Sequence, residues 1–244
     1  MSALRSHLWH ASGGLVYHWR ALRYRRRLWQ PFAAQVARWL ADWQPAQEEL
    51  VIVGPSAGYT LDAGFLARFA RVTILEPDPI ARSLLRRRFA GIHFEKGRVD
   101  CFSGMDGPRA LSQAYPRAAI LFANSIGQQL ERLDPGWPAA LQAALQGHSW
   151  ASYHDVTATA QAPRQNAAAQ CFASGASLEE VLAGFWPGGE LVLHDHGSFG
   201  VLPAQAYAIW SITPQQHHLV EWSSITVVGP SSIMPGNSGI SGRS

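Results

Sequence analysis

The fold is decided by residues 50–59, which read Leu50-Val51-Ile52-Val53-Gly54-Pro55-Ser56-Ala57-Gly58-Tyr59. Four apolar residues in a row are typical of a short strand that is buried on both faces of a parallel sheet. The small residues that follow predict a tight turn at the end of this strand. When such a turn opens a helix, a ligand can approach the backbone and meet the helix amides. This stretch therefore predicts an α/β sheet with a ligand site at its edge.

The same alternation of strands and helices continues along the chain. Further strands are predicted over residues 72–75, 92–95, 118–123, 149–156 and 190–194, and a β-hairpin over 207–213 and 218–228. Helices are predicted after the glycine turn up to Phe69, over 79–89 and 137–146, and from a capping box at Ser177 to Phe185. Alternation of this kind predicts a parallel sheet covered by helices on both faces, made mixed by the antiparallel hairpin.

The composition excludes several classes of protein. Of the 244 residues, 47% are hydrophobic and 15% are charged, which is incompatible with intrinsic disorder. The two cysteines, Cys101 and Cys171, predict a reducing compartment rather than a disulfide framework. The sequence shows neither an apolar run of the roughly 20 residues that span a membrane nor the pattern of a signal peptide. We therefore expect a cytoplasmic protein without a membrane partner.

The positive charge is mild overall but locally concentrated. The net charge is +3, and of the 20 basic residues only Lys96 is a lysine. The arginines cluster between residues 20 and 27 and between 82 and 88, and aromatic and histidine side chains accompany the first cluster. The first segment is predicted to be an amphipathic helix that packs its aromatic face on the sheet. A functional alternative is a cap over the ligand site whose arginines recruit an anionic substrate. Binding of RNA by stacking and phosphate contacts is a further alternative, but the modest net charge disfavours nucleic acid as a partner.

Glu76 ends the second predicted strand, eighteen residues after Gly58. A carboxylate at this spacing after a glycine turn can accept hydrogen bonds from both hydroxyl groups of a ribose. The turn also matches Gly-x-Ser-x-Gly, in which Ser56 would be a nucleophile served by Asp155 and His194. The fifty or so residues before it look helical and leave no room for the earlier strands of such a hydrolase, which makes this the weaker hypothesis.

These elements together resemble class I S-adenosylmethionine-dependent methyltransferases over roughly residues 46–228. The resemblance implies a Rossmann-like methyltransferase fold with S-adenosylmethionine as cofactor. By position it implies cofactor-binding roles for the glycine turn, for the ribose-binding acid, for a residue near the adenine and for two residues beside the methyl donor: Gly54, Ser56, Gly58, Glu76, Asp100, Asn124 and Ser125. Two departures are Ile52, where the family usually has an acid, and Ser56, where it has its middle glycine.

Three regions follow from this resemblance and from the composition. Residues 1–46 are predicted to be an N-terminal helical cap, and residues 47–228 a Rossmann-like cofactor-binding domain. Residues 229–244 are rich in Gly, Ser and Pro and are predicted to be a disordered tail.

Two groups of histidine and aspartate follow β-like segments, His154-Asp155 and His194-Asp195-His196. One hypothesis is that His154 or His194 acts as a general base whose paired carboxylate orients the ring. A zinc or iron site is a second, and packed or solvated loop residues are a third. We predict catalytic roles for His154, Asp155, His194 and His196 and assign no metal ligand.

The expected function is methyl transfer from S-adenosylmethionine to a small-molecule or peptide acceptor. The alternative from another class is a non-catalytic scaffold or binding protein that keeps the fold, and a serine hydrolase using Ser56 is the second alternative. Nothing in the sequence argues against a homo-oligomer, and acceptor identity is not encoded in any motif.

Overall fold

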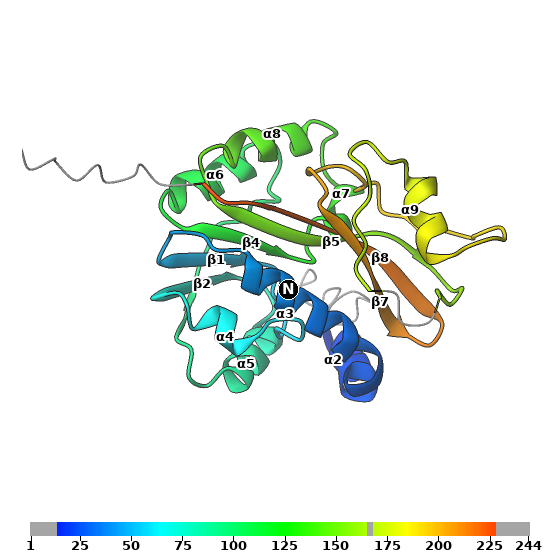
Figure 1. Cartoon of the computed structure of the whole chain (residues 1–244). Helices are drawn as coiled ribbons and strands as arrows, with labels where there is room; N and C mark the ends of the chain where they lie inside the picture. The colour runs from blue at the N-terminus through cyan, green and yellow to red at the C-terminus, as the bar shows by residue number, and fades with distance from the viewer. Residues whose placement is uncertain (1–13, 165–167, 228–244) are drawn as a thin grey trace, which may run out of the picture.

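The computed structural model describes residues 14–164 and 168–227, and the tail predicted at 229–244 lies outside them. The described residues form one eight-stranded sheet in the order β3-β2-β1-β4-β5-β8-β7, with β6 paired to β5 (Figure 1). The strands are β1 Glu49–Val53, β2 Arg71–Leu75, β3 Phe94–Lys96, β4 Ala119–Ala123, β5 Trp150–Thr159, β6 His194–Asp195, β7 Ala206–Thr213 and β8 Gln216–Ile225. Strands β1 to β5 pair in parallel, whereas β8 runs antiparallel to both β5 and β7.

Helices cover both faces of the sheet. They are α2 Gly14–Tyr24, η1 Arg25–Trp29, α3 Gln30–Asp42, α4 Ala63–Leu66, α5 Pro79–Arg88, α6 Gly107–Ala114, α7 Gly127–Leu130, α8 Trp137–Ala144 and α9 Leu178–Phe185. Helices α3, α4 and α5 pack on one face in one core cluster, and α6 and α8 pack on the other face in a second (Figure 1). None of the helices in the described part of the chain combines the length and apolarity needed to cross a membrane.

The predicted Rossmann-like architecture is confirmed, including the antiparallel hairpin at the end of the sheet. The capping box is also present, because Ser177 Oγ accepts from the Glu180 amide and the Glu180 carboxylate accepts from the Ser177 amide. The predicted strand over 190–194 is wrong, since only His194–Asp195 pairs with β5. Its alternating pattern comes from a loop in which Leu191 and Leu193 pack toward α9 while Val192 is 81% exposed.

Smaller differences concern element lengths. Helix α4 ends at Leu66 rather than near Phe69, and β3 begins at Phe94 rather than at Ile92. Helices α6 and α7 were not predicted from the sequence. Each of the two has at most eight residues, so its apolar periodicity is too short to stand out in a sequence window.

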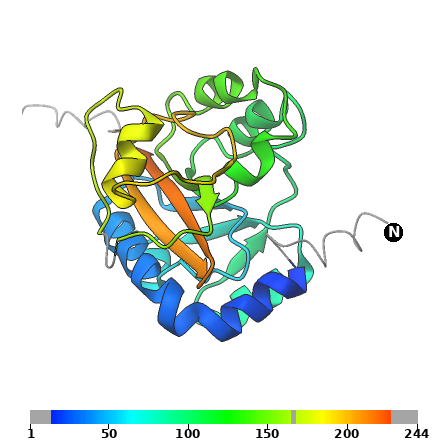
Figure 2. The same ribbon diagram turned by 90° about the vertical axis from the view of Figure 1, so that its right-hand side faces the viewer.

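A single bent helix, formed by α2, η1 and α3, lies against the hairpin end of the sheet. Figure 2 shows it in blue, running past the β7–β8 hairpin in orange. The bend coincides with η1, a five-residue π-helix that places Trp29 in the core. The Trp29 indole donates to the Ile212 carbonyl at 3.0 Å and packs edge-on against Trp210. Phe32 of α3 stacks on the same Trp210 ring, so the bent helix and the sheet share one hydrophobic core.

Candidate active site

Two residues with strained backbones mark the carboxyl ends of neighbouring strands. Ser56 follows β1 with φ of 49°, and Asn124 follows β4 with φ of 55°. In the described part of the chain these are the non-glycine residues with positive φ. The left-handed region is unfavourable for side chains other than glycine and persists where the surrounding structure demands it, commonly at functional sites. Both residues lie at the sheet edge where α/β folds bind ligands.

The two glycines of the turn allow close packing. Gly54 has φ of 65°, and a Cβ placed on it would lie 2.7 Å from the Ser125 Cβ. Ser125 in turn donates from Oγ to the Val53 carbonyl at 3.2 Å, which ties the β4 loop to the end of β1. Gly58 also has φ of 65°, and a Cβ there would overlap the Leu85 side chain. The glycine turn is therefore held rigidly between the β4 loop and α5.

Glu76 connects the end of β2 to this turn. Its carboxylate accepts a hydrogen bond from the Ser56 amide at 2.8 Å and another from the Asp78 amide at 2.9 Å. Burial raises the pKa of Glu76, while the two backbone hydrogen bonds oppose that rise. A carboxylate offers about four acceptor positions, of which these bonds use two. Glu76 is thus fixed in place and retains capacity for two further donors.

Aromatic side chains of α2 lie beside the turn. His18 Nδ1 is 3.0 Å from the Tyr59 hydroxyl, and His18 Nε2 is 3.8 Å from an Asp78 carboxylate oxygen. The Arg88 guanidinium lies over the Tyr59 ring, 5.2 Å from its centroid. Burial raises the pKa of Tyr17, and negative charge on Asp155 and Glu76 raises it further. Tyr17 and His18 of α2 both pack against the Tyr59 ring, with centroids 5.7 and 5.9 Å away.

Asp155 forms the centre of the second half of the site. It is 3% exposed, and its side chain lies at a β-bulge, where the pairing of β5 with β8 shifts between Asp155 and Thr157. The Asn124 amide group donates to Asp155 Oδ2 at 3.2 Å, and the Asp155 backbone amide donates to Asn124 Oδ1 at 3.0 Å. His218 of β8 places Nδ1 3.2 Å from Asp155 Oδ2. Asn124 and His218 thus hold the carboxylate from two strands.

The charges of this cluster support one another. Burial by itself would raise the pKa of Asp155, but His218, His196 and the Asn124 amide together bring it below its ordinary value. Burial lowers the pKa of His196, against the opposing charge of Asp155. An ionised carboxylate beside a neutral imidazole can accept a proton or bind a cation.

The structure separates His154 from Asp155, although the two are adjacent in the sequence. Neighbouring residues of a strand point to opposite faces, so His154 lies on the other side of β5. It is fully buried there, with Nδ1 3.1 Å from Ser152 Oγ and Nε2 3.3 Å from the Ser198 carbonyl oxygen. The expected pair of a base with its orienting carboxylate is therefore not formed by these two residues.

The other predicted residues fall in different places. His194 is exposed and lies 3.7 Å from Glu131, whereas His196 lies against the Asp155 cluster, its ring stacked with that of His218. The hypothetical nucleophile Ser56 is not joined by a triad, since Asp155 pairs with His218 and not with His194. Asp100 sits in an exposed turn after β3 and accepts from the Phe102 amide at 3.0 Å.

Sequence reasoning missed His218 and Glu131. His218 belongs to a hairpin strand that β5 joins only in the folded sheet, so spacing along the chain gives no signal for it. A usable signal was the His217-His218 pair next to the apolar residues Leu219 and Val220 of a predicted strand, because buried histidines need partners.

Glu221 is expected to make the stability of this protein depend on pH. Its carboxyl group is buried beside His154, Nε2 to Oε1 being 3.7 Å, and it accepts from the Gly200 amide at 3.1 Å. Burial raises the pKa of Glu221 from 4.5 to about 7, and it lowers the pKa of His154 to about 4. Between pH 4.5 and 7 the native state keeps a proton at Glu221 that the unfolded chain has lost. Stability contributed by this group is therefore present at low pH and falls as pH rises through that window.

We expect Glu221→Gln to remove this part of the pH dependence. The free energy of unfolding of the variant minus that of the wild type should increase by on the order of 1–3 kcal/mol as the pH is raised from 5 to 8. Urea denaturation at both pH values measures the difference, with the exposed Glu190→Gln as the matched control. A wild-type-minus-variant difference that is equal at pH 5 and pH 8 would contradict the prediction.

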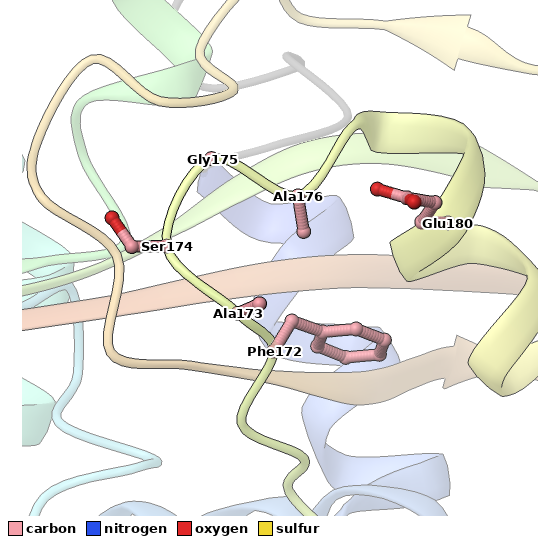
Figure 3. Close-up of a pocket in the computed structure, with 6 residues that line it drawn as sticks. All are labelled: Phe172, Ala173, Ser174, Gly175, Ala176 and Glu180. Carbon is pink, nitrogen blue, oxygen red and sulfur yellow. The ribbon is translucent and has the colours of Figure 1, made fainter.

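A surface hollow beside α9 carries little chemistry. Figure 3 shows its lining, Phe172 to Ala176 together with Glu180. Glu180 is the ionisable side chain among these residues, and it is engaged in the capping box of α9. None of the lining residues belongs to the glycine turn or to the Asp155 cluster.

No family model and no curated protein matches the chain. Among solved structures it is similar to the magnesium protoporphyrin IX methyltransferase of Synechocystis PCC 6803, at 9% identity and a TM-score of 0.41, over 91% of this chain and 93% of that one. It is also similar to the N-methyltransferase NodS of Bradyrhizobium japonicum WM9, at 11% identity and a TM-score of 0.43, over 91% and 96% of the two chains. At these identities and TM-scores the likeness assigns neither an activity nor a site residue. The chain's own strand order and antiparallel hairpin are those of the Rossmann-like methyltransferase fold.

Proposed function

We propose that this protein transfers a methyl group from S-adenosylmethionine to a small-molecule or peptide acceptor. The observation that carries the proposal is the carboxylate of Glu76, held at the end of β2 by the amide of Ser56 in the glycine turn. Its unused acceptor positions fit the two hydroxyl groups of a ribose. The strained Ser56 and Asn124 at the same sheet edge support a ligand-binding role for the adjoining loops.

The residues present fit this cofactor in the following way. Glu76 would hold the ribose, the Gly54–Gly58 turn the methionine part, and Asp100 the region near the adenine. Asn124 and Ser125 would border the methyl group. When bound, S-adenosylmethionine supplies an electrophilic methyl group on a positively charged sulfur atom.

The remaining chemistry concerns the acceptor. Methyl transfer is an in-line displacement and depends mainly on proximity and alignment. Asn124, Asp155 and His218 form a hydrogen-bonded and charged group that can bind a hydroxyl or amine. A proton leaving the acceptor could pass to a neutral imidazole of this group, and the lowered pKa of His196 keeps that ring in its neutral form. Within the predicted catalytic set this assigns the chemistry to Asp155 and His196, whereas His154 and His194 lie apart from it.

Isothermal calorimetry with S-adenosylmethionine and with S-adenosylhomocysteine tests the proposal on the full chain. We expect both to bind with one site per chain, and adenine alone, which lacks the ribose and the methionine part, to bind far more weakly. Absence of heat with both would overturn the proposed function and favour a scaffold that keeps the fold without the cofactor.

A further inference from the structure

We propose that Asp155, His196 and His218 form a binding site for a divalent transition-metal ion, with Zn²⁺ as the expected occupant. One side-chain atom from each residue lies within 4.8 Å of the other two. Two imidazoles and one carboxylate are a ligand set suited to zinc or iron and unlike the all-oxygen sets that Mg²⁺ and Ca²⁺ prefer.

Three buried polar atoms in this cluster have no hydrogen-bond partner. They are Asp155 Oδ1, His196 Nε2 and His218 Nδ1, one from each residue. Asp155 is 3% exposed and His218 8% exposed, so water does not reach these atoms freely. Buried polar groups are almost always satisfied, and a shared bound ion is one way in which three such atoms are satisfied together.

The contact between Asp155 and His218 has the spacing of two ligands. Asp155 Oδ2 and His218 Nδ1 are 3.2 Å apart, yet the nitrogen makes no aligned hydrogen bond. Two atoms that bind a tetrahedral ion at about 2.1 Å each are roughly 3.4 Å apart. The observed distance is therefore compatible with an ion between them.

The groups around the three ligands fix their orientation. The Asn124 amide donates to one lone pair of Asp155 Oδ2, so the second lone pair of Oδ2 and the whole of Oδ1 stay open to an ion. The other ring nitrogen of His196 lies 4.0 Å from a Glu131 carboxylate oxygen. Ligating histidines commonly have such a partner on the nitrogen that faces away from the metal.

The backbone brings the ligands together from three segments. Asp155 stands at the β-bulge of β5, and His218 lies on the antiparallel neighbour β8. Along the edge of β5, the His196 amide donates to the Val156 carbonyl at 3.0 Å, which places His196 next to the bulge. A three-ligand set leaves room for a fourth ligand, as catalytic zinc sites do. If the proposed function holds, that fourth ligand is the acceptor hydroxyl or amine, whose pKa the ion lowers.

The test uses the full chain, stripped with a chelator and titrated with ZnCl₂ by calorimetry, with bound zinc counted by mass spectrometry. We expect one ion per chain and an increase in Tm on binding. His196→Ala should weaken binding by about 100-fold or more, and Asp155→Asn should do likewise while keeping the size of the side chain. The Co²⁺ form should show the visible absorption of a four- or five-coordinate site, lost in both variants.

His194→Ala is the matched control, because His194 is exposed and faces Glu131 rather than Asp155. Its zinc affinity should equal that of the wild type. If His194→Ala weakens binding as much as His196→Ala does, the ion sits at Glu131, His194 and His196, and the proposal is wrong. Absence of stoichiometric zinc binding by the wild type would also overturn it. Neither readout needs S-adenosylmethionine, so failure of the proposed function would leave the metal result interpretable.

Discussion

Glu76→Ala is expected to lower the affinity for S-adenosylmethionine by about 100-fold or more. Hydrogen bonds to a charged group contribute roughly 1.5–3 kcal/mol each, and the carboxylate is proposed to accept two from the ribose. The substitution also releases the Ser56 amide, which Glu76 now holds at 2.8 Å, so the glycine turn loses its fixed position. Calorimetry of the variant beside the wild type measures the change in Kd.

Two controls separate a binding effect from a folding effect. Glu95→Ala removes an exposed carboxylate at β3 that pairs with Arg71, and it should leave the affinity unchanged. Glu76→Gln keeps the shape of the side chain but offers one acceptor oxygen to the two backbone amides, so its loss of affinity should be smaller than that of Glu76→Ala. The Tm of each variant, measured beside its Kd, reports any effect on folding. Unchanged affinity in Glu76→Ala would show that this carboxylate does not hold the cofactor.

Trp210→Ala is expected to destabilise the protein by about 3–5 kcal/mol. Trp210 is 1% exposed, stacks on Phe32 with ring centroids 5.0 Å apart, and meets Trp29 edge-on at 5.4 Å. Removing the indole leaves a cavity where the bent helix packs on β7, and the surrounding rings can close it only in part. Urea denaturation gives the free energy of unfolding of both proteins.

Trp19→Ala is the matched control for this prediction. Trp19 lies on α2 but is 60% exposed, so its loss should change the free energy of unfolding by no more than about 0.5 kcal/mol. A loss below about 1 kcal/mol in Trp210→Ala would mean that the bent helix does not depend on this aromatic cluster.

The part of the molecule around Glu76 could be predicted because its signals are local. The apolar runs that form β1 and β2 are buried on both faces. The small residues Gly54 to Gly58 after β1 are typical of a tight turn. The position of Glu76 at the end of β2 was predicted from the apolar run before it and from its distance of eighteen residues from Gly58. The sequence also contains the capping box of α9 within four residues, from Ser177 to Glu180.

The Asp155 cluster could not be predicted in the same way. His218 reaches Asp155 only because β8 lies between β5 and β7 in the folded sheet. Asp155 also lies at a β-bulge, and no pattern in the sequence predicts that bulge. The expected pair of His154 with Asp155 failed on strand geometry, since neighbours in a strand face opposite sides. Contacts that depend on the order of strands in the sheet or on bulges join residues far apart in the sequence, so no local sequence pattern predicts them.

The π-helix at Arg25–Trp29 also fixes the rotational phase of helix α2, Gly14–Tyr24, relative to α3. Each residue turns an α-helix by about 100°, and a π-helical turn accommodates one residue more than the α-helical turn it replaces. A chain shortened by one residue in this stretch could continue as a regular α-helix, and Tyr17 and His18 would then rotate away from Tyr59. The number of residues between Tyr24 and Gln30, more than their identity, decides which side chains of α2 face the sheet edge.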